Sequence, residues 1–169
     1  MIDVRPATPE DVGQLHAMIL ELAEYERAAD QVTATEEDLL KALFGSGSDF
    51  VPSLFAHVVD GDGELAGMAI WFLNYSTWDG RHGIYLEDLY VRPQYRGTGI
   101  GTELLRTLAT ICHDRGYSRF QWWVLDWNTP AIDVYTSMGA VAMDEWTVYR
   151  LTGDPLHALA QRRKADSPS

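Results

Sequence analysis

The centre of the chain is a glycine-rich stretch that reads Tyr95-Arg96-Gly97-Thr98-Gly99-Ile100-Gly101-Thr102-Glu103-Leu104. Its three glycines stand at alternate positions, and a helical pattern of apolar residues begins directly after them. Glycine adopts backbone conformations that other residues avoid, and it leaves amide N–H groups open to a ligand. A helix N-terminus adds unpaired N–H donors and a positive dipole end. The stretch therefore predicts a phosphate-binding loop with Arg96 at its entrance. We call residues 96–101 the glycine cradle.

Motif spacing narrows the choice of phosphate ligand. The P-loop motif needs a lysine directly after its last glycine, and none follows these glycines. The dinucleotide-binding motif needs a third glycine where this chain has Thr102. What remains is Arg-x-x-Gly-x-Gly between a strand and an amphipathic helix. An ordinary glycine-rich connection between a strand and a helix is the alternative at this point.

Length and composition predict one soluble domain. The 169 residues suffice for one domain with a full core, expected over residues 1–160, with 161–169 as a disordered tail. No run of 18 apolar residues and no signal-peptide pattern is present, so we expect no membrane association. Cys112 is the single cysteine and cannot form an internal disulfide. These features predict a cytoplasmic protein.

The charge balance bears on partners. The formal net charge of −12 argues against nucleic acid, whose binding needs a basic surface. Long-range attraction would favour the approach of a cationic substrate. Acidic surfaces also serve solubility, so the charge supports a small cationic partner only weakly.

Hydrophobic periodicity and turn signals predict the order of elements. Two capping boxes, Thr8-Pro9-Glu10-Asp11 and Thr35-Glu36-Glu37-Asp38, indicate helix starts, and Asp60-Gly61-Asp62-Gly63 indicates a hairpin turn. Strands are expected at 2–5, 54–59, 65–75, 84–91, 120–125 and 146–151. Helices are expected after residues 8, 35 and 128, and one opens from the glycine cradle. The fold class is α/β of the α+β type, because a Rossmann domain would alternate strand and helix throughout.

Two acidic residues interrupt an otherwise apolar strand. Glu87 and Asp88 follow Ile84-Tyr85-Leu86 and precede Leu89-Tyr90-Val91. Neighbouring strand residues point to opposite faces, so at least one carboxylate should face the core unless a bulge intervenes. A buried unpaired carboxylate is costly, which favours a functional role. The alternative is an edge-strand pair that faces solvent.

Nearly the whole chain resembles the diamine/polyamine (spermidine/spermine) N-acetyltransferase branch of the GCN5-related N-acetyltransferase (GNAT) superfamily, including its thialysine-preferring relatives. The Arg-x-x-Gly-x-Gly element is shared by the superfamily, whereas Tyr85-Leu86-Glu87-Asp88 and Trp127-Asn128 are more specific to this branch. The segments that carry the resemblance are Arg5–Thr8, Glu21–Glu26, Asp30–Val32, Tyr75–Trp78, Tyr85–Asp88, Tyr95–Gly101, Asp126–Asn128, Tyr135 and Gly139-Ala140.

The resemblance implies a fold, a co-substrate and a set of binding residues. The implied GNAT fold is a mixed, mostly antiparallel central sheet flanked by helices, with a strand–Gly-rich loop–helix site for acetyl-CoA. It implies a homodimer and no metal. Coenzyme contacts are implied for the backbones of Leu89 and Val91 and for Arg96, Gly97, Thr98, Gly99, Ile100, Gly101, Asn128 and Tyr135. Substrate contacts are implied for Tyr25, Glu26, Trp78, Glu87 and Asp88.

The chemistry of amine acetylation gives two of these residues catalytic roles. A free alkylamine is mostly ammonium at neutral pH and must lose a proton before it attacks a thioester. Glu87 is the expected base, acting through a water, while Asp88 helps to hold the cation. The departing thiolate needs a proton, and the phenol of Tyr135 is the expected donor. By periodicity alone, Tyr135 is simply a core aromatic.

Two points stay open at the level of sequence. Polyamine enzymes carry basic residues where this chain has Thr136-Ser137-Met138, so coenzyme contacts at these positions are open. The choice between polyamine, diamine and thialysine-like substrates is open as well. A non-catalytic acyl-CoA-binding module and a protein or peptide N-acetyltransferase are the alternative functions. The second of these predicts a broad peptide groove.

Overall fold

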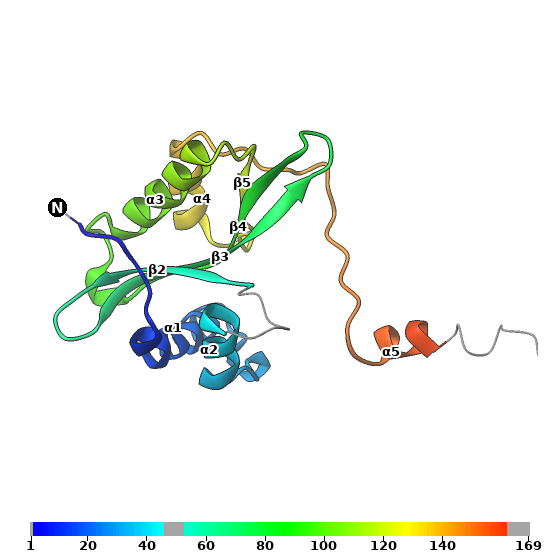
Figure 1. Cartoon of the computed structure of the whole chain (residues 1–169), viewed down its shortest axis with the longest axis horizontal. Helices are drawn as coiled ribbons and strands as arrows, with labels where there is room; N and C mark the ends of the chain where they lie inside the picture. The colour runs from blue at the N-terminus through cyan, green and yellow to red at the C-terminus, as the bar shows by residue number, and fades with distance from the viewer. Residues whose placement is uncertain (1, 46–52, 162–169) are drawn as a thin grey trace, which may run out of the picture. The chain divides into compact units, whose positions relative to one another are not determined.

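The computed structural model describes residues 2–45 and 53–161 and divides the chain into two compact units (Figure 1). The first unit spans Met1–Trp127 and the second spans Asn128–Ser169. Each unit is described by itself below. The expected disordered tail at 161–169 lies, apart from residue 161, outside the described residues.

The first unit is built on a five-stranded sheet with the strand order β1-β2-β3-β4-β5. The first four strands are antiparallel, and β5 pairs in parallel with β4. Their bounds are β1 Arg5–Pro6, β2 Phe55–Asp60, β3 Leu65–Ser76, β4 Arg81–Val91 and β5 Phe120–Gln121. The mixed, mostly antiparallel sheet predicted from the sequence is confirmed.

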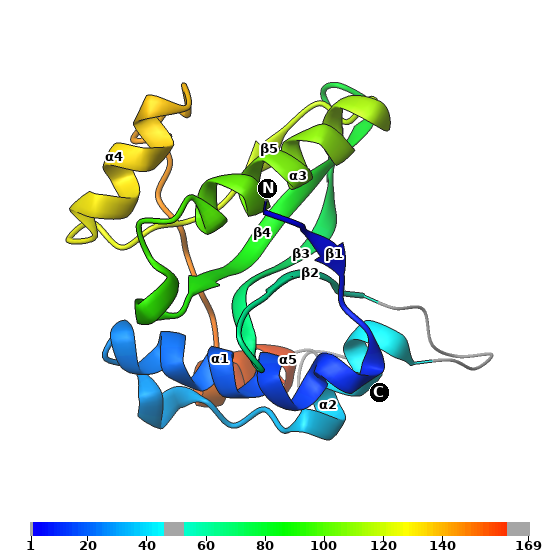
Figure 2. The same cartoon turned by 90° about the vertical axis from the view of Figure 1, so that its left-hand side faces the viewer.

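Helices cover both faces of this sheet, as Figure 2 shows. On one face lie α1 (Val12–Tyr25) and α2 (Glu36–Phe44), which begin after the two predicted capping boxes; the short 3-10 turn Pro9–Asp11 precedes α1, and another, Ala29–Gln31, precedes α2. On the other face lies α3 (Ile100–Asp114). A Cβ at Gly67 of β3 would come within 2.6 Å of Ile100 Cγ2, so the start of α3 packs directly on the sheet.

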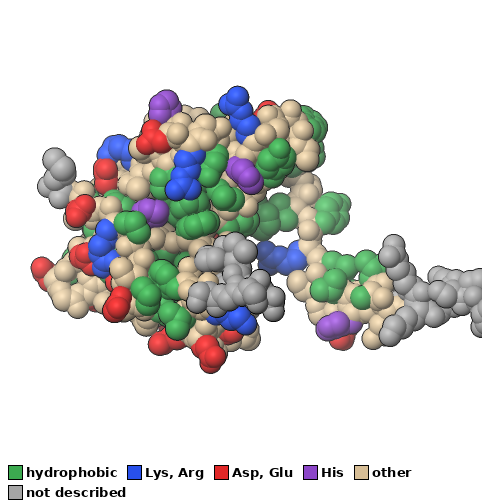
Figure 3. Space-filling model, viewed as in Figure 1, with side chains coloured by type: hydrophobic (Ala, Val, Ile, Leu, Met, Phe, Trp, Pro, Cys, Tyr) green, Lys and Arg blue, Asp and Glu red, His purple; other side chains and the backbone are tan. Residues whose placement is uncertain are grey.

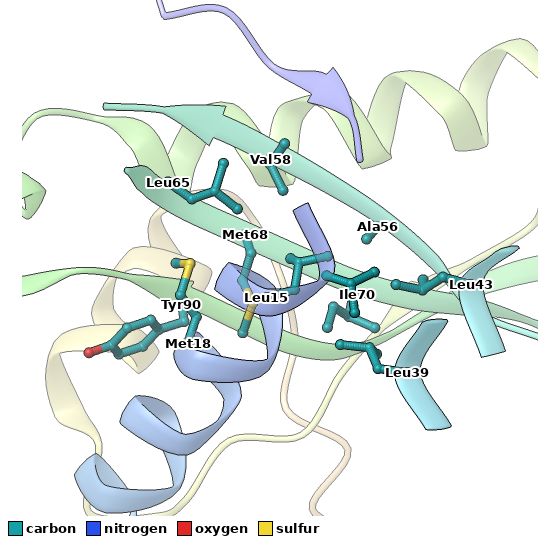
Figure 4. Packing of buried hydrophobic residues seen from close by; sticks show 11 residues of the cluster. Leu15, Met18, Leu39, Leu43, Ala56, Val58, Leu65, Met68, Ile70 and Tyr90 are labelled. Atoms are coloured by element: carbon teal, nitrogen blue, oxygen red, sulfur yellow. The ribbon is translucent and has the colours of Figure 1, made fainter. Parts of the chain in front are cut away.

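The main core fills the space between the sheet and the α1–α2 layer (Figure 4). Leu15 and Met18 of α1 are fully buried against Met68 and Ile70 of β3. Tyr90 of β4 belongs to the same cluster, which fixes the face of β4 that looks toward α1. Carboxylates gather on the outer side of this layer (Figure 3), among them the acidic first turn of α2.

Several predicted element bounds need correction in the described residues. The first strand is Arg5–Pro6 rather than 2–5, and the strand expected over 120–125 ends at Gln121. The β5 pairing with β4 stops at Tyr85, two positions before an irregularity in β4, so the residues after Gln121 have no neighbouring strand to bond. The second unit contains α4 (Thr129–Ser137) as predicted, then α5 (Gly153–Gln161), which the sequence reading missed.

The strand predicted over 146–151 is wrong. These residues are described and have no regular secondary structure. Alternating apolar residues predict which side chains share a face, but a strand forms only where a second strand completes its hydrogen bonds. The second unit offers no such partner among its described residues.

Candidate active site

The glycine cradle joins the end of β4 to the start of α3 through a 3-10 turn at Pro93–Tyr95. Gly97 has φ 75° and Gly99, the residue before α3, has φ 93°. Thr98 Oγ1 donates to the carbonyl of Tyr95 at 2.6 Å, which fixes the loop between the two glycines. The first amides of α3 have no carbonyl partner within the helix, so they point out of its N-terminus as free donors.

The conformation of these glycines explains why the loop cannot use other residues. Side chains of L-residues are strained at positive φ, so both positions favour glycine. A Cβ at Gly97 would meet no atom within 4 Å, so packing does not exclude a side chain there, and the positive φ alone favours glycine. Open space beside helix N–H donors fits the pyrophosphate of a coenzyme.

Arg96 lies between the cradle and α1. Its Nε donates to the carbonyl of Val91 at 2.9 Å, and its guanidinium lies over the rings of Tyr25 (5.1 Å) and Tyr90 (5.5 Å). Both distances are within the range of cation–π attraction. Arg96, which was predicted to stand at the cradle entrance, thus also contacts Tyr25, a residue expected to bind the substrate.

Backbone groups at the edge of β4 next to the cradle point away from β3, and one of them, the carbonyl of Val91, accepts the bond from Arg96. The Arg92 N–H donates to Ala66 O of β3 at 3.0 Å. Every second residue of an antiparallel strand bonds the same neighbour, so Tyr90 also bonds β3. The residues between, Leu89 and Val91, direct their N–H and C=O groups away from β3. On that side β5 pairs only with Ile84 and Tyr85. The backbones of Leu89 and Val91, implied as contacts for the pantetheine arm, therefore face an edge that no described strand covers.

A β-bulge separates the two carboxylates of β4. Ile70 pairs with Asp88 and the next residue, Trp71, pairs with Leu86, so Glu87 is the extra residue. Asp88 follows the same alternation as Tyr90 and faces the α1 side, where it is half-buried, whereas Glu87 is exposed. The expectation that one carboxylate turns toward the interior is confirmed, and the reading in which both face solvent is wrong.

The pKa of the Asp88 carboxyl lies close to neutral pH. Burial, followed by the negative charges of Glu87 and Glu26, raises its pKa to about 7. Glu26, the residue that ends α1, has its own pKa raised by burial. We call Glu26, Glu87 and Asp88 the acidic cluster. It unites the end of α1 with β4, and a carboxyl near pKa 7 can take up a proton at neutral pH.

Tyr25, the residue before Glu26 in the sequence, contacts the aromatic side chain of Trp127. The two rings lie 5.7 Å apart with an interplanar angle of 52°. Trp127 in turn has the guanidinium of Arg27 over its ring at 5.7 Å. Arg96, Tyr25, Trp127 and Arg27 therefore form a continuous row of cation–aromatic contacts along the end of α1.

Comparison with known proteins agrees with this geometry. A model of the acetyltransferase (GNAT) family matches residues 15–140, which include most of α1, the acidic cluster, the cradle and α4. The chain belongs to the GNAT family of N-acetyltransferases. It is 41% identical to a thialysine N-epsilon-acetyltransferase of Sus scrofa, a match that covers 93% of this chain and 96% of the relative.

Further relatives extend this similarity. An L-ornithine N5-acetyltransferase of Arabidopsis thaliana is 33% identical, with 92% of this chain and 86% of the relative covered. Among solved structures, an integron cassette protein of Vibrio cholerae has a TM-score of 0.75 at 25% identity, covering 95% of this chain and 98% of that one. The predicted GNAT fold and the resemblance to the thialysine and spermidine/spermine branch are confirmed. GNAT acetyltransferases use acetyl-CoA.

Three residues expected in the GNAT site belong neither to the cradle, nor to the acidic cluster, nor to the row of contacts just described. Trp78 is at the turn between β3 and β4 and is 91% exposed. From Arg81 to Asp88 β4 rises by roughly 23 Å, so this chain does not bring Trp78 to its own acidic cluster. Asn128 and Tyr135 belong to the second unit, where Asn128 is the residue before α4 and Tyr135 lies on α4. Their roles stay predictions.

Sequence reasoning overlooked Arg27 and the aromatic role of Trp127. Glycine is the usual residue just after a helix end such as Tyr25-Glu26. The arginine that follows them instead was the sequence feature that could have pointed to Arg27. Trp127 is part of the family resemblance, but its contact with Tyr25 could not be predicted. The two residues belong to segments that lie far apart in the sequence. In the described residues, no helix is long and apolar enough to cross a membrane, and no three His, Cys, Asp or Glu side chains gather as metal ligands.

Proposed function

We propose that this GNAT enzyme transfers the acetyl group of acetyl-CoA to a primary amine of a small cationic substrate, by direct transfer in a ternary complex. The observation that carries the proposal is the acidic cluster beside the glycine cradle, with its half-buried Asp88. Asp88 lies on the same strand end that leads into the cradle, and no described cation forms a salt bridge with it. A small ammonium group would supply the missing positive charge.

The acidic cluster would also remove the proton from the ammonium. Glu87 is the base that we propose, acting through a water because the bulge leaves its carboxylate exposed. Asp88 would hold the cation, and its pKa of about 7 makes it a second group able to exchange a proton at neutral pH. The freed amine then attacks the thioester carbonyl, and C–N bond formation accompanies loss of the C–S bond.

The leaving sulfur would take its proton from Tyr135. The support for this role is the resemblance to the family, together with the position of Tyr135 on α4, where the sequence predicted a helix. The nitrogen gives up two protons in all, one before it attacks and one as the tetrahedral intermediate collapses. One proton reaches the sulfur through Tyr135 and one is released to solvent, so the products are an amide, a free thiol and H⁺. Arg96 and the amides of residues 97–101 would hold the pyrophosphate, and Leu89, Val91 and Asn128 would contact the rest of the coenzyme.

The substrate class that we propose is a thialysine-like amino acid or a diamine or polyamine. The relatives support this range, because one is named for thialysine, one for L-ornithine and another for spermidine/spermine. All of these amines are short, flexible and cationic. A cluster of carboxylates suits such cations through charge attraction.

Steady-state release of CoA with a panel of amines tests the proposal. The panel contains L-thialysine, L-ornithine, 1,4-diaminobutane, spermidine and a lysine-containing peptide. We expect turnover of at least one small amine and no more than background with the peptide. Acetyl-CoA binding without turnover of any amine would instead indicate a coenzyme-binding module, and faster reaction with the peptide would indicate a protein acetyltransferase.

A further inference from the structure

The end of α1 carries a residue in an unfavourable backbone conformation. Arg27 has φ 61° and, among the residues that the structure describes, it is the one non-glycine residue at positive φ. The Arg27 N–H donates to Glu24 O at 3.0 Å and the Ala28 N–H donates to Ala23 O at 2.8 Å. This pair of bonds is the Schellman motif, whose left-handed position is normally filled by glycine. The helix end alone would therefore favour glycine over arginine.

The side chain of Arg27 is held where it projects from this helix end. Its guanidinium lies over the ring of Trp127 at 5.7 Å, and that ring contacts Tyr25 at 5.7 Å. Tyr25 and Arg27 flank Glu26 in the sequence, so the backbone of Arg27 directly follows the member of the acidic cluster that stands at the end of α1. The left-handed residue thus places a positive charge on the ring of Trp127, one position along the chain from that carboxylate. Strained residues of this kind concentrate at functional sites.

The charges of the acidic cluster favour one part of an amino acid and disfavour another. Three carboxylates attract an ammonium group, but they repel a carboxylate on the same molecule. A diamine presents no such conflict. An α-amino acid with a terminal amine does, since its carboxylate lies at the opposite end of a short chain from the reacting nitrogen. A cation at the border of the cluster would resolve the conflict.

We propose that Arg27 binds the α-carboxylate of an amino-acid substrate and thereby makes this enzyme prefer amino acids with a terminal amine over the corresponding diamines. The proposal rests on the function proposed above and narrows its substrate class. The planar guanidinium of arginine suits a carboxylate, with which it forms paired hydrogen bonds. Packing on Trp127 pre-orients that group and lowers the entropy lost on binding.

A purely structural role for Arg27 makes a different prediction. If the side chain only ends α1 and covers Trp127, the variant Arg27→Gly should be at least as stable as the unmodified protein, and its substrate preference should not change. If Arg27 binds substrate, Arg27→Gly keeps the fold but loses the preference. This substitution therefore separates the two roles without a risk of unfolding from strain.

The experiment compares two matched amines that differ only by a carboxylate. L-Thialysine and its decarboxylated counterpart, bis(2-aminoethyl) sulfide, are each assayed with acetyl-CoA for kcat and KM. We expect Arg27→Gln and Arg27→Gly to lower the kcat/KM ratio of thialysine to diamine about tenfold, mainly through KM for thialysine. Arg27→Lys should retain part of the ratio, because it keeps the charge but not the fork geometry.

The matched control is Arg106→Gln, which makes the same change of charge at an exposed site on α3 where Arg106 pairs with Glu103. It should leave the ratio unchanged, which excludes an effect of net charge. Equal ratios in Arg27→Gln, Arg27→Gly and the unmodified protein would overturn the role of Arg27 while leaving the proposed function intact. An unmodified protein that acetylates neither amine nor any other amine of the panel overturns both.

Discussion

The glycine cradle and the acidic cluster lie at the same end of β4, yet they are built in different ways. The cradle consists of consecutive residues, and it works through backbone conformation, with Gly97 and Gly99 at positive φ. The acidic cluster draws Glu26 from the end of α1 and the other two carboxylates from a bulge in β4, and it works through side-chain charge. Substitutions in the two regions should therefore change different quantities: coenzyme binding for the cradle, and proton transfer and amine binding for the cluster.

The largest effect is expected from Tyr135→Phe, which tests whether proton donation is separate from coenzyme binding. Loss of a general acid lowers turnover by about 100-fold or more. The Kd for acetyl-CoA, measured by isothermal titration calorimetry, should change little, since the ring is kept. A weaker acetyl-CoA complex with unchanged turnover at saturation would place Tyr135 with the cradle in function and remove it as the acid.

The next effect concerns stability and depends on pH. The pKa of Asp88 is raised above that of an unfolded aspartate, so its ionisation disfavours the folded state above pH 7, and this penalty fades as the pH falls toward 4. Replacing the carboxyl by an amide, Asp88→Asn, should therefore raise the free energy of unfolding at pH 8 by about 2–4 kcal/mol. Near pH 4 the two proteins should be equally stable.

Urea unfolding at pH 4, 6 and 8 measures this difference. The exposed neighbour Glu87→Gln is the matched control, because it also replaces a carboxylate by an amide on the same strand. We expect its effect on unfolding to vary far less with pH. A stability gain of Asp88→Asn that is the same at pH 4 and pH 8 would show that ionisation of the buried carboxyl does not oppose folding.

The same two variants identify the base. Glu87→Gln should shift the rise of kcat/KM toward higher pH, where more of the amine is already neutral, and should lower the rate at pH 7 about tenfold. Asp88→Asn should chiefly raise KM for the amine. Rate profiles from pH 5.5 to 10 are compared for both. If the pH profile of kcat/KM shifts only in Asp88→Asn, the proton acceptor is Asp88, and Glu87 takes no part in proton transfer.

The difference between the two regions also explains what the sequence could predict. The cradle was found from glycine spacing, because the residues that form a backbone site are adjacent in the chain. The acid pair was found for a similar reason, as two charges inside one apolar strand. The bulge that buries Asp88 and exposes Glu87 depends on the register against β3, which periodicity does not specify.

Contacts between distant elements were the part that sequence reasoning could not reach. Glu26 raises the pKa of Asp88 across the space between α1 and β4, and Trp127 contacts Tyr25 from the other end of the first unit. The wrong prediction of a strand at 146–151 has the same cause. The apolar residues do alternate there, but the neighbouring strand that would complete the hydrogen bonds was only assumed. Patterns along a chain show which residues share a face, and only the fold shows what they meet.

The smallest effect tests the cradle against a loop with the same backbone conformation. Gly97 (φ 75°) and Gly63 (φ 77°) both have open space where a Cβ would stand, so Gly97→Ala and Gly63→Ala impose a similar backbone strain, about 1 kcal/mol or more. Both variants should lose stability by similar amounts. Only Gly97→Ala should raise KM for acetyl-CoA, about fivefold, since relaxation of the strain displaces amides that would bond the pyrophosphate.

Because the two glycines differ only in location, the comparison removes stability as an explanation. KM for acetyl-CoA is measured at saturating amine, and thermal unfolding of both variants supplies the common scale. The cradle assignment requires kcat to stay near that of the unmodified protein in both. An equal rise of KM in the two alanine variants would mean that the cradle is an ordinary strand-to-helix connection, with no more influence on the coenzyme than the hairpin turn at Gly63.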